Sequence, residues 1–489
     1  MHSLVTLFSL VHSLTKSEKR YFRLVASAQN GDKDYLRLFD CLERSPFFDA
    51  VLKEKLTALF PGLTIEPARK YLYRVIMKSL RQFEADSQVE TQLMNLLQDS
   101  AILFNKGLID AGFEQLEKAK RLALQHQKFQ FFILAGRQEL QFLIRLQFAG
   151  VDEFSLIEKQ EKIRELLAHE TTLQQQSSLY EVLLLRYWKK GVVRSQQEIT
   201  RLNDLLLEEH HILNSHQLQT FDSQQLHLHF QSIYFLMTGN SPGSLSIFYE
   251  LDALFQKNRH LWSGTPLYYI QLLTGILHTL RRLGRYEEMT FFLHHLQALP
   301  VTSGSLALQV KYLILEHELQ RAVDQHQYPE ALQLIRQHAL LERELGQLPF
   351  AIQAQLGLMV SRVWFGLQAY STALHWINRI LNQPVDSLNR LLYVSCRLMN
   401  LLIHTALDNQ DYLDYEIRSI ERKLKSEPYG FRAERLVLNL LKQWLKNKPL
   451  NEFSDQLALL ADDPFEQQLI LDLGLKDWVR RMGHAPKPQ

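Results

Sequence analysis

Four phrases decide the fold of this chain: Gly284-Arg285-Tyr286-Glu287-Glu288-Met289, Tyr328-Pro329-Glu330-Ala331, Tyr370-Ser371-Thr372-Ala373 and Tyr412-Leu413-Asp414-Tyr415. Their four tyrosines, Tyr286, Tyr328, Tyr370 and Tyr412, are spaced 42 residues apart. Each one follows a long segment with apolar residues at helical spacing and begins a second such segment. A fixed period of this size is typical of stacked supersecondary units, not of a single globular core.

The composition indicates a folded, all-α protein. Hydrophobic residues make up 46% of the 489 residues and charged residues 22%, which is the balance of a globular chain and not of a disordered one. The 19 glycines and 14 prolines fall below the usual shares of about 7% and about 5%. Alternating Val, Ile and Thr are scarce, so the chain is poor in both turns and strands.

Charge and cysteine content favour a cytoplasmic protein. A net charge of +2 gives no global attraction to nucleic acid or to a membrane surface. Cys41 and Cys396 lie far apart inside apolar helical patterns and are predicted to be buried free thiols, which favours a reducing compartment. The apolar first fifteen residues keep a helical spacing and lack a charged start, so they indicate a helix and not a signal peptide. No run approaches the ~18 apolar residues of a membrane span.

The repeated segments resemble the tetratricopeptide-repeat superfamily. The shared pattern is a turn glycine or tyrosine followed by small and bulky residues at helical spacing. Its copies are Gly107, Ile109, Gly112, Leu116 and Ala119; Gly239, Ser244, Phe248 and Leu251; Gly284, Tyr286, Met289, Leu293 and Leu296; Tyr328, Ala331 and Ile335; Tyr370, Ala373 and Ile377. The resemblance implies a right-handed superhelix of helical hairpins, an α-solenoid, whose first helices line a concave side that binds extended peptides or helices.

Four regions are expected along the chain. They are an N-terminal helical domain over 1–86, divergent tetratricopeptide-like hairpins over 87–270, regular 42-residue repeats over 271–426, and capping helices with a frayed tail over 427–489. A capping box at Thr15-Lys16-Ser17-Glu18 predicts a helix start. Between about 128 and 230 we expect hairpins of irregular length, with a helix start or loop near 171–178. Terminal helices are expected at about 433–446, 452–461 and 464–482.

The resemblance also nominates a partner-binding groove. Mapping the inward face of each first helix by position selects Gln271, Thr274, His278, Arg282, Glu316, Gln320, Arg362, Arg397, Asn400 and His404. Three arginines and two histidines against one glutamate would make a mildly positive groove, which suits an acidic segment or a C-terminal carboxylate. The alternative is that these are ordinary solvated residues and that the binding face lies elsewhere.

A basic helix near the N-terminus offers a second surface. The helix predicted from residue 64 places Ala68, Leu72, Val75, Ile76, Ser79 and Phe83 on one side. Its opposite side carries the stripe Lys70, Arg74, Lys78 and Arg81. This stripe could contact DNA phosphates as part of a recognition helix. It could equally be the solvated face of a packed helix or the contact for an acidic protein.

Catalytic and metal-binding patterns are weak. Gly239-Asn240-Ser241-Pro242-Gly243 spells the nucleophile elbow of serine hydrolases, but that motif needs a preceding strand, and here a helix precedes it. His210, His211, His216, His227 and His229 lack Asp or Cys at ligand spacing and are expected to be surface or half-buried residues and not a zinc site. No enzyme activity, metal or cofactor is therefore expected.

Two functions follow from these features. The leading hypothesis is a non-enzymatic protein–protein interaction scaffold that binds a partner's peptide or helix in the groove, with no membrane partner. The alternative is a transcriptional regulator in which the N-terminal helical domain contacts DNA and the repeats act as a sensor.

Overall fold

The computed structural model describes residues 3–27, 34–46, 48–61, 65–85, 88–190, 193, 196–214, 220–262, 266–301, 304–338, 341–384, 388–425, 430–448, 450 and 452–484. Every regular element within these ranges is a helix, as the composition predicts. None of the described helices is long and apolar enough to cross a membrane.

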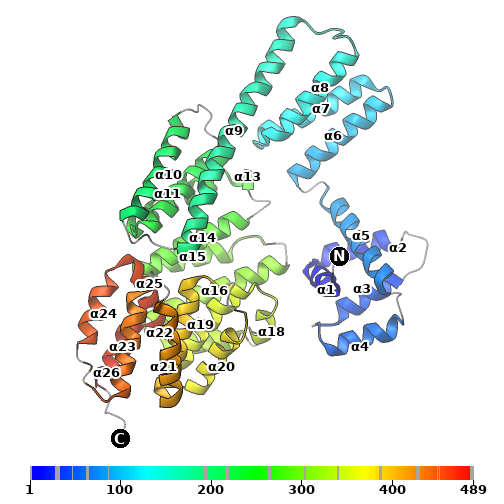
Figure 1. The fold of residues 1–489 in the computed structure, drawn as a ribbon. Coiled ribbons are helices and arrows are strands. Elements are labelled where there is room, and N and C mark those ends of the chain that lie inside the picture. The colour runs from blue at the N-terminus through cyan, green and yellow to red at the C-terminus, as the bar shows by residue number, and fades with distance from the viewer. Residues whose placement is uncertain are drawn as a thin grey trace. The chain divides into compact units, whose positions relative to one another are not determined.

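Contacts between backbone segments divide the chain into two compact units. The first comprises Met1–Gln174, Asn258–Pro266 and Pro300–Ala307. The second comprises Gln175–Lys257, Leu267–Leu299 and Leu308–Gln489. Within the first unit, residue 86, where the sequence suggests a boundary, falls between the apolar core of residues 7–76 and the apolar core of residues 93–135. Figure 1 labels most of the helices in both units.

Five helices form the N-terminal part of the first unit. They are α1 (Leu4–Ser13), α2 (Lys16–Ser27), α3 (Asp34–Arg44), α4 (Ala50–Leu59) and α5 (Ile65–Phe83). They share one apolar core, which includes Leu7, Phe22, Phe39 and Leu72. The predicted capping box is confirmed, because Glu18 N donates to Thr15 Oγ1 at 3.2 Å and Thr15 N donates to Glu18 Oε2 at 2.6 Å.

The rest of the first unit consists of longer helices and one short helix. These are α6 (Val89–Asn105), α7 (Ile109–Gln125), α8 (Phe129–Arg145), the first part of α9 (Glu153–Lys190) and the short α13 (Arg259–Trp262). A buried ion pair ties α7 to α8, since Lys120 Nζ lies 2.7 Å from Glu139 Oε2. Lys159 of α9 reaches the second oxygen of the same carboxylate at 2.9 Å.

Helix α9 overturns one sequence prediction. It runs unbroken for 38 residues, so the segment 171–178 lies in its interior and is neither a helix start nor a loop. No glycine or proline interrupts the stretch. Thr171 and Thr172 turn their hydroxyls back onto the carbonyls of Leu167 and Ala168, at 2.9 and 3.2 Å. These bonds keep the two side chains from competing with the helix.

The second unit contains the periodic region (Figure 1). Its helices are α10 (Gln196–Asn214), α11 (Phe221–Met237), α12 (Ser241–Lys257), α14 (Leu267–Arg282), α15 (Tyr286–Gln297), α16 (Gly304–Asp324, from Leu308 on), α17 (Tyr328–Gln337), α18 (Leu341–Leu345), α19 (Phe350–Gly366), α20 (Tyr370–Leu381), α21 (Arg390–Ala406), α22 (Gln410–Lys425), α23 (Arg432–Leu445), α24 (Phe453–Ala461), α25 (Pro464–Leu473) and α26 (Leu475–His484). The C-terminal part of α9 also belongs to this unit.

The hairpins of the periodic region share one turn geometry. Their turns centre on residues with positive φ, namely Gly284 at 70°, His326 at 60°, Gln368 at 62° and Asp408 at 56°. In each turn the next N–H bonds to the carbonyl five residues earlier, as in Arg285 N to Leu280 O at 2.9 Å and Asn409 N to His404 O at 3.0 Å. These bonds satisfy carbonyls that the helix end would leave without a partner.

The same turns correct the register of the fourth repeat. Gly284, His326 and Gln368 follow one another at intervals of 42, but Asp408 comes only 40 residues after Gln368. Helix α22 accordingly begins at Gln410, and Tyr412 lies inside it. The 42-residue spacing of the fourth tyrosine is therefore a coincidence and does not mark a turn, whereas Tyr286, Tyr328 and Tyr370 each begin a helix.

Packing explains why a tyrosine recurs at the start of the second helix. Tyr286 reaches the end of the next hairpin's first helix, where its hydroxyl lies 3.5 Å from Asp324 Oδ2. Tyr328 occupies the matching place one repeat later, over Gly366. A Cβ at Gly366 would meet the Tyr328 ring at 2.1 Å. Glycine is therefore required there by space.

Candidate functional site around Arg281

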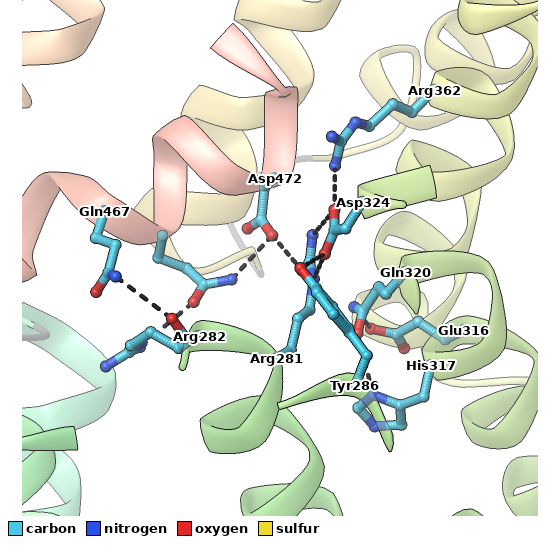
Figure 2. Close-up of polar contacts among 11 residues, drawn as sticks. Arg281, Arg282, Tyr286, Glu316, His317, Gln320, Asp324, Arg362, Gln467 and Asp472 are labelled. Carbon is cyan, nitrogen blue, oxygen red and sulfur yellow. Dashed lines mark hydrogen bonds and ion pairs between the residues drawn. The ribbon is translucent and has the colours of Figure 1, made fainter. Parts of the chain in front are cut away.

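The candidate site is a buried cluster of charges at the ends of three first helices and on α25. Arg281 of α14 lies between Asp324 of α16 and Asp472 of α25, and Arg362 of α19 approaches Asp324 from the other side (Figure 2). Arg281 Nε is 2.7 Å from Asp324 Oδ2, and Arg281 Nη1 is 2.6 Å from Asp472 Oδ1. Arg362 Nη1 is 3.3 Å from Asp324 Oδ1.

Burial makes these contacts strong and mutually dependent. The side chains of Arg281 and Asp324 are each 1% exposed. Asp324 is the last residue of α16, where the helix dipole disfavours a carboxylate, so the two arginines must compensate for it. Burial opposes the charge of Arg281, but Asp324 and Asp472 outweigh burial and raise its pKa. For Arg362 burial prevails and lowers the pKa.

Helix α25 rests on this cluster. It contacts α14, α21 and α23 and buries Leu469, Ile470 and Leu473 in the apolar core. Gln467 Nε2 donates to the Arg282 carbonyl, and Arg282 Nη2 donates to Gln468 Oε1, both at 3.4 Å. A helix expected to be part of a terminal cap is thus held against α14, the first helix of the regular repeats.

The third C-terminal helix differs from its prediction. A single helix over 464–482 is expected, but Gly474 adopts a left-handed φ of 59° and separates α25 from α26. A Cβ at Gly474 would come within 2.7 Å of Arg362 Nη2. Gly474 therefore has two structural roles. It allows the chain to turn between α25 and α26, and it leaves space for the Arg362 side chain beside α25.

A second polar group adjoins the cluster within α14 and α16. Gln320 Nε2 donates to Glu316 Oε1 at 2.9 Å, and Gln320 Oε1 faces His317 Nδ1 at 3.0 Å. The rings of His317 and His278 meet edge to face, with centroids 4.8 Å apart. Burial raises the pKa of Glu316 to about 7 and lowers that of His278 to about 4. Burial also lowers the pKa of His317, well below its usual value.

Only part of the predicted groove converges on this site. His278, Gln320 and Arg362 occupy one repeat position on α14, α16 and α19, and all three are in or beside the clusters just described, as is Glu316. Arg282 lies at the edge, against α25. Gln271 is exposed, and the Thr274 hydroxyl bonds to the Ile270 carbonyl at 2.8 Å.

The three predicted residues of α21 instead contact α22. Arg397 lies 3.5 Å from Glu416, Asn400 accepts a hydrogen bond from Tyr412 at 2.9 Å, and His404 stacks on the Tyr412 ring at 3.9 Å. The cause is the shorter fourth repeat. Because the true spacing there is 40, the position that matches Arg362 is Leu402 and not His404.

Sequence reasoning missed Arg281, Asp324 and Asp472. One signal was available, since Asp324 lies 42 residues after Arg282, which places opposite charges at the same repeat position. Nothing local points to Asp472, which is 191 residues away from Arg281.

The basic stripe forms as predicted. Lys70, Arg74, Lys78 and Arg81 are all exposed on α5, and within the described ranges none of them pairs with a carboxylate. The opposite side, from Ala68 to Ser79, is buried as expected. Phe83 is the exception, because it is 39% exposed and packs against the Tyr21 ring.

The remaining candidate residues have structural surroundings. Ser241 is buried and begins α12 directly after the turn that follows α11. His227 contacts Glu209, and buried His229 stacks on Tyr180, while His216 lies outside the described residues. No group of three potential metal ligands occurs within the described ranges. Cys396 is buried and Cys41 partly so, each as a free thiol.

Comparison with protein-family models, curated proteins and solved structures finds no match. The tetratricopeptide resemblance therefore depends on the quoted residue pattern. The case for function depends on the contacts around Arg281 and on the exposed basic stripe.

Proposed function

We propose that this chain is a non-enzymatic interaction scaffold, an α-solenoid of tetratricopeptide-like hairpins that binds a helical segment of a partner protein. The binding face comprises the ends of α14, α16 and α19 around Arg281. One observation carries the proposal: this face already holds a helix, α25, through the contact of Arg281 with Asp472. Laying a helix against a surface built from other helices is a common mode of peptide recognition.

Charge on this face supports a carboxylate-bearing ligand. Without α25, two buried arginines, Arg281 and Arg362, face one buried carboxylate, Asp324. The excess positive charge is compensated by Asp472. Arginine pairs with carboxylates through a planar fork that fixes geometry as well as energy. A partner helix with an aspartate or glutamate at the place of Asp472 would compensate the excess positive charge in the same way.

Affinity capture with the full chain tests the scaffold proposal. We expect Arg282→Glu to lose most of the proteins that the unaltered chain recovers from the source cells, because a carboxylate at the edge of the site repels an acidic helix. Arg418→Glu is the matched control, since Arg418 is 71% exposed on α22, away from the cluster. Circular dichroism verifies folding. Identical recovery by both variants would exclude this face as the binding site.

A second candidate function is contact with DNA through α5. The observation that favours it is the stripe of four exposed cations, Lys70, Arg74, Lys78 and Arg81, with no carboxylate paired to any of them in the described part of the chain. Cations placed along one face of a helix can neutralise phosphates and release counterions on binding. In this case the chain would be a regulator whose repeats bind a second partner.

Mobility shift of random duplex DNA by the full chain tests this alternative. We expect the pair Lys70→Glu and Arg74→Glu to weaken binding and to reduce the salt slope by about 2, because each lost phosphate contact removes about 0.9. The control pair is Lys162→Glu and Arg164→Glu, whose side chains are 41% and 69% exposed on α9. Absence of a shift at low salt, or an equal loss in both pairs, would rule the DNA function out.

A further inference from the structure

Helix α25 gives Arg281 a carboxylate partner, Asp472, but gives the neighbouring Arg282 only the neutral amide of Gln468. We propose that α25 is an internal ligand of the Arg281 site and that the external ligand is a more acidic helix, with carboxylates at the places of both Gln468 and Asp472. This inference rests on the proposed scaffold function and specifies its partner. The partner helix would keep apolar residues at the places of Leu469, Ile470 and Leu473, which α25 buries.

The first argument is that the charges of the site stay paired when α25 leaves. Arg281 is held by two carboxylates, and only Asp472 belongs to α25. Asp324 retains both of its arginines through contacts of 2.7 Å to Arg281 and 3.3 Å to Arg362. Removing α25 therefore leaves no buried charge without a partner of opposite sign. It leaves two arginines, Arg281 and Arg362, with one carboxylate, Asp324, and this excess positive charge favours binding of an anion. The partner helix would also have to replace Glu466 of α25, which accepts hydrogen bonds from Arg432 N and Ala433 N at 2.8 and 3.0 Å.

The second argument is that Arg282 is poorly used by α25. Its Nε and Nη1 are buried and have no hydrogen-bond partner among the described residues. Its Nη2 donates to the neutral amide oxygen of Gln468 at 3.4 Å, near the limit of a hydrogen bond. A buried donor without a partner costs free energy, and a carboxylate would accept from it more strongly than an amide does.

One more acid would give Arg282 a charged partner, as Asp324 and Asp472 already give Arg281 and Arg362. Arg281, Arg282 and Arg362 face Asp324 and Asp472. A glutamate at the place of Gln468 would bring the carboxylates to the same number as the arginines. Gln468 and Asp472 are four residues apart, so both lie on the face of α25 that meets α14. In α25 the Gln468 amide also donates to Asp472 Oδ1 at 2.9 Å. A glutamate would lose that bond and gain the charged pair with Arg282 in its place.

The third argument concerns competition. Helix α25 is tethered to its site, and a tether raises the local concentration of a ligand to the order of mM. A ligand with identical contacts would therefore displace it poorly. An additional ion pair with Arg282 would give an external helix the extra binding free energy that it needs to displace α25. A free helix of ten residues is marginal in water, so the displaced segment would not remain helical.

Peptide binding to the full chain tests the inference. The probes are two labelled synthetic peptides, residues 463–476 with the natural sequence and the same peptide with Gln468→Glu, measured by fluorescence anisotropy. The receptor is the full chain with Asp472→Asn, which weakens its own α25. We expect the Gln468→Glu peptide to bind roughly tenfold more tightly than the natural one. In the receptor with Arg282→Met added, that difference should vanish.

Two further measurements make the outcome decisive. The unaltered chain should bind both peptides more weakly than the Asp472→Asn chain, and a full chain with Gln468→Glu should bind them most weakly, because its own α25 is then held by Arg282. Equal affinity for the two peptides would overturn the acidic-partner inference. Absence of peptide binding to every receptor would show that α25 is a permanent part of the fold. The scaffold proposal would still be decided separately, by whether partner capture depends on Arg282.

Discussion

Arg281→Met is expected to lower the free energy of unfolding by about 3–5 kcal/mol, the range for breaking a buried ion pair by removing one partner. The substitution leaves Asp324, itself 1% exposed, with only the 3.3 Å contact to Arg362. It also leaves Asp472 without its 2.6 Å contact to Arg281. Both carboxylates lose the cation that offsets their removal from water. Urea denaturation followed by far-UV circular dichroism measures the loss.

The neighbouring arginine provides a matched control. Arg282→Met removes the same charge from the same helix, but Arg282 makes only a 3.4 Å contact with a neutral amide. We expect its effect to remain within about 1 kcal/mol. Equal decreases in the free energy of unfolding for Arg281→Met and Arg282→Met would contradict the conclusion that Arg281, and not Arg282, makes the buried ion pairs.

Glu316→Gln is expected to stabilise the chain by roughly 3 kcal/mol at pH 8 and to have little effect near pH 5. Burial raises the pKa of Glu316 from 4.5 to about 7. Between these values the folded state holds a proton that the unfolded state has released. Stability contributed by this group is therefore present below pH 4.5 and lost as the pH rises through about 7. Glutamine stays neutral and can still accept the hydrogen bond from Gln320 at the same oxygen.

The difference in the free energy of unfolding between the Glu316→Gln variant and the unaltered chain isolates the contribution of Glu316. His278 and His317 have lowered pKa values because of burial, so they remove stability as the pH falls below 6.5 toward about 4. Both proteins contain these histidines, and their contribution cancels. Urea denaturation across pH 5 to pH 8 gives the comparison, with Glu287→Gln, an exposed carboxyl on α15, as control. A difference that does not change with pH would show that Glu316 is charged in the folded protein at neutral pH.

Local interactions explain the successful predictions. The capping box at Thr15 and Glu18, the hairpin turns at Gly284, His326 and Gln368, and the buried side of α5 each depend on residues within one or two helical turns. A period in the sequence records such interactions directly, because the same local structure recurs wherever the same residues recur.

The errors have equally physical causes. A tyrosine at position 412 continues the period of 42, yet the turn is set by the backbone at Asp408, and the fourth repeat is two residues shorter. Residues 171–178 are rich in Thr, Gln and Ser, which suggests a break. Inside α9, however, the threonine hydroxyls bond to the helix's own carbonyls.

The sequence by itself determined the all-α class and the first three hairpins of the periodic region, since these follow from hydrophobic periodicity and from residues that recur at the turns. Only the tertiary structure decided that Arg281 rather than Arg282 carries the buried charge, and that α25 lies against α14. Adjacent positions on a helix point in different directions, so packing alone selects between the two arginines. Asp472 meets Arg281 across 191 residues, and no local pattern encodes a contact between segments that folding brings together.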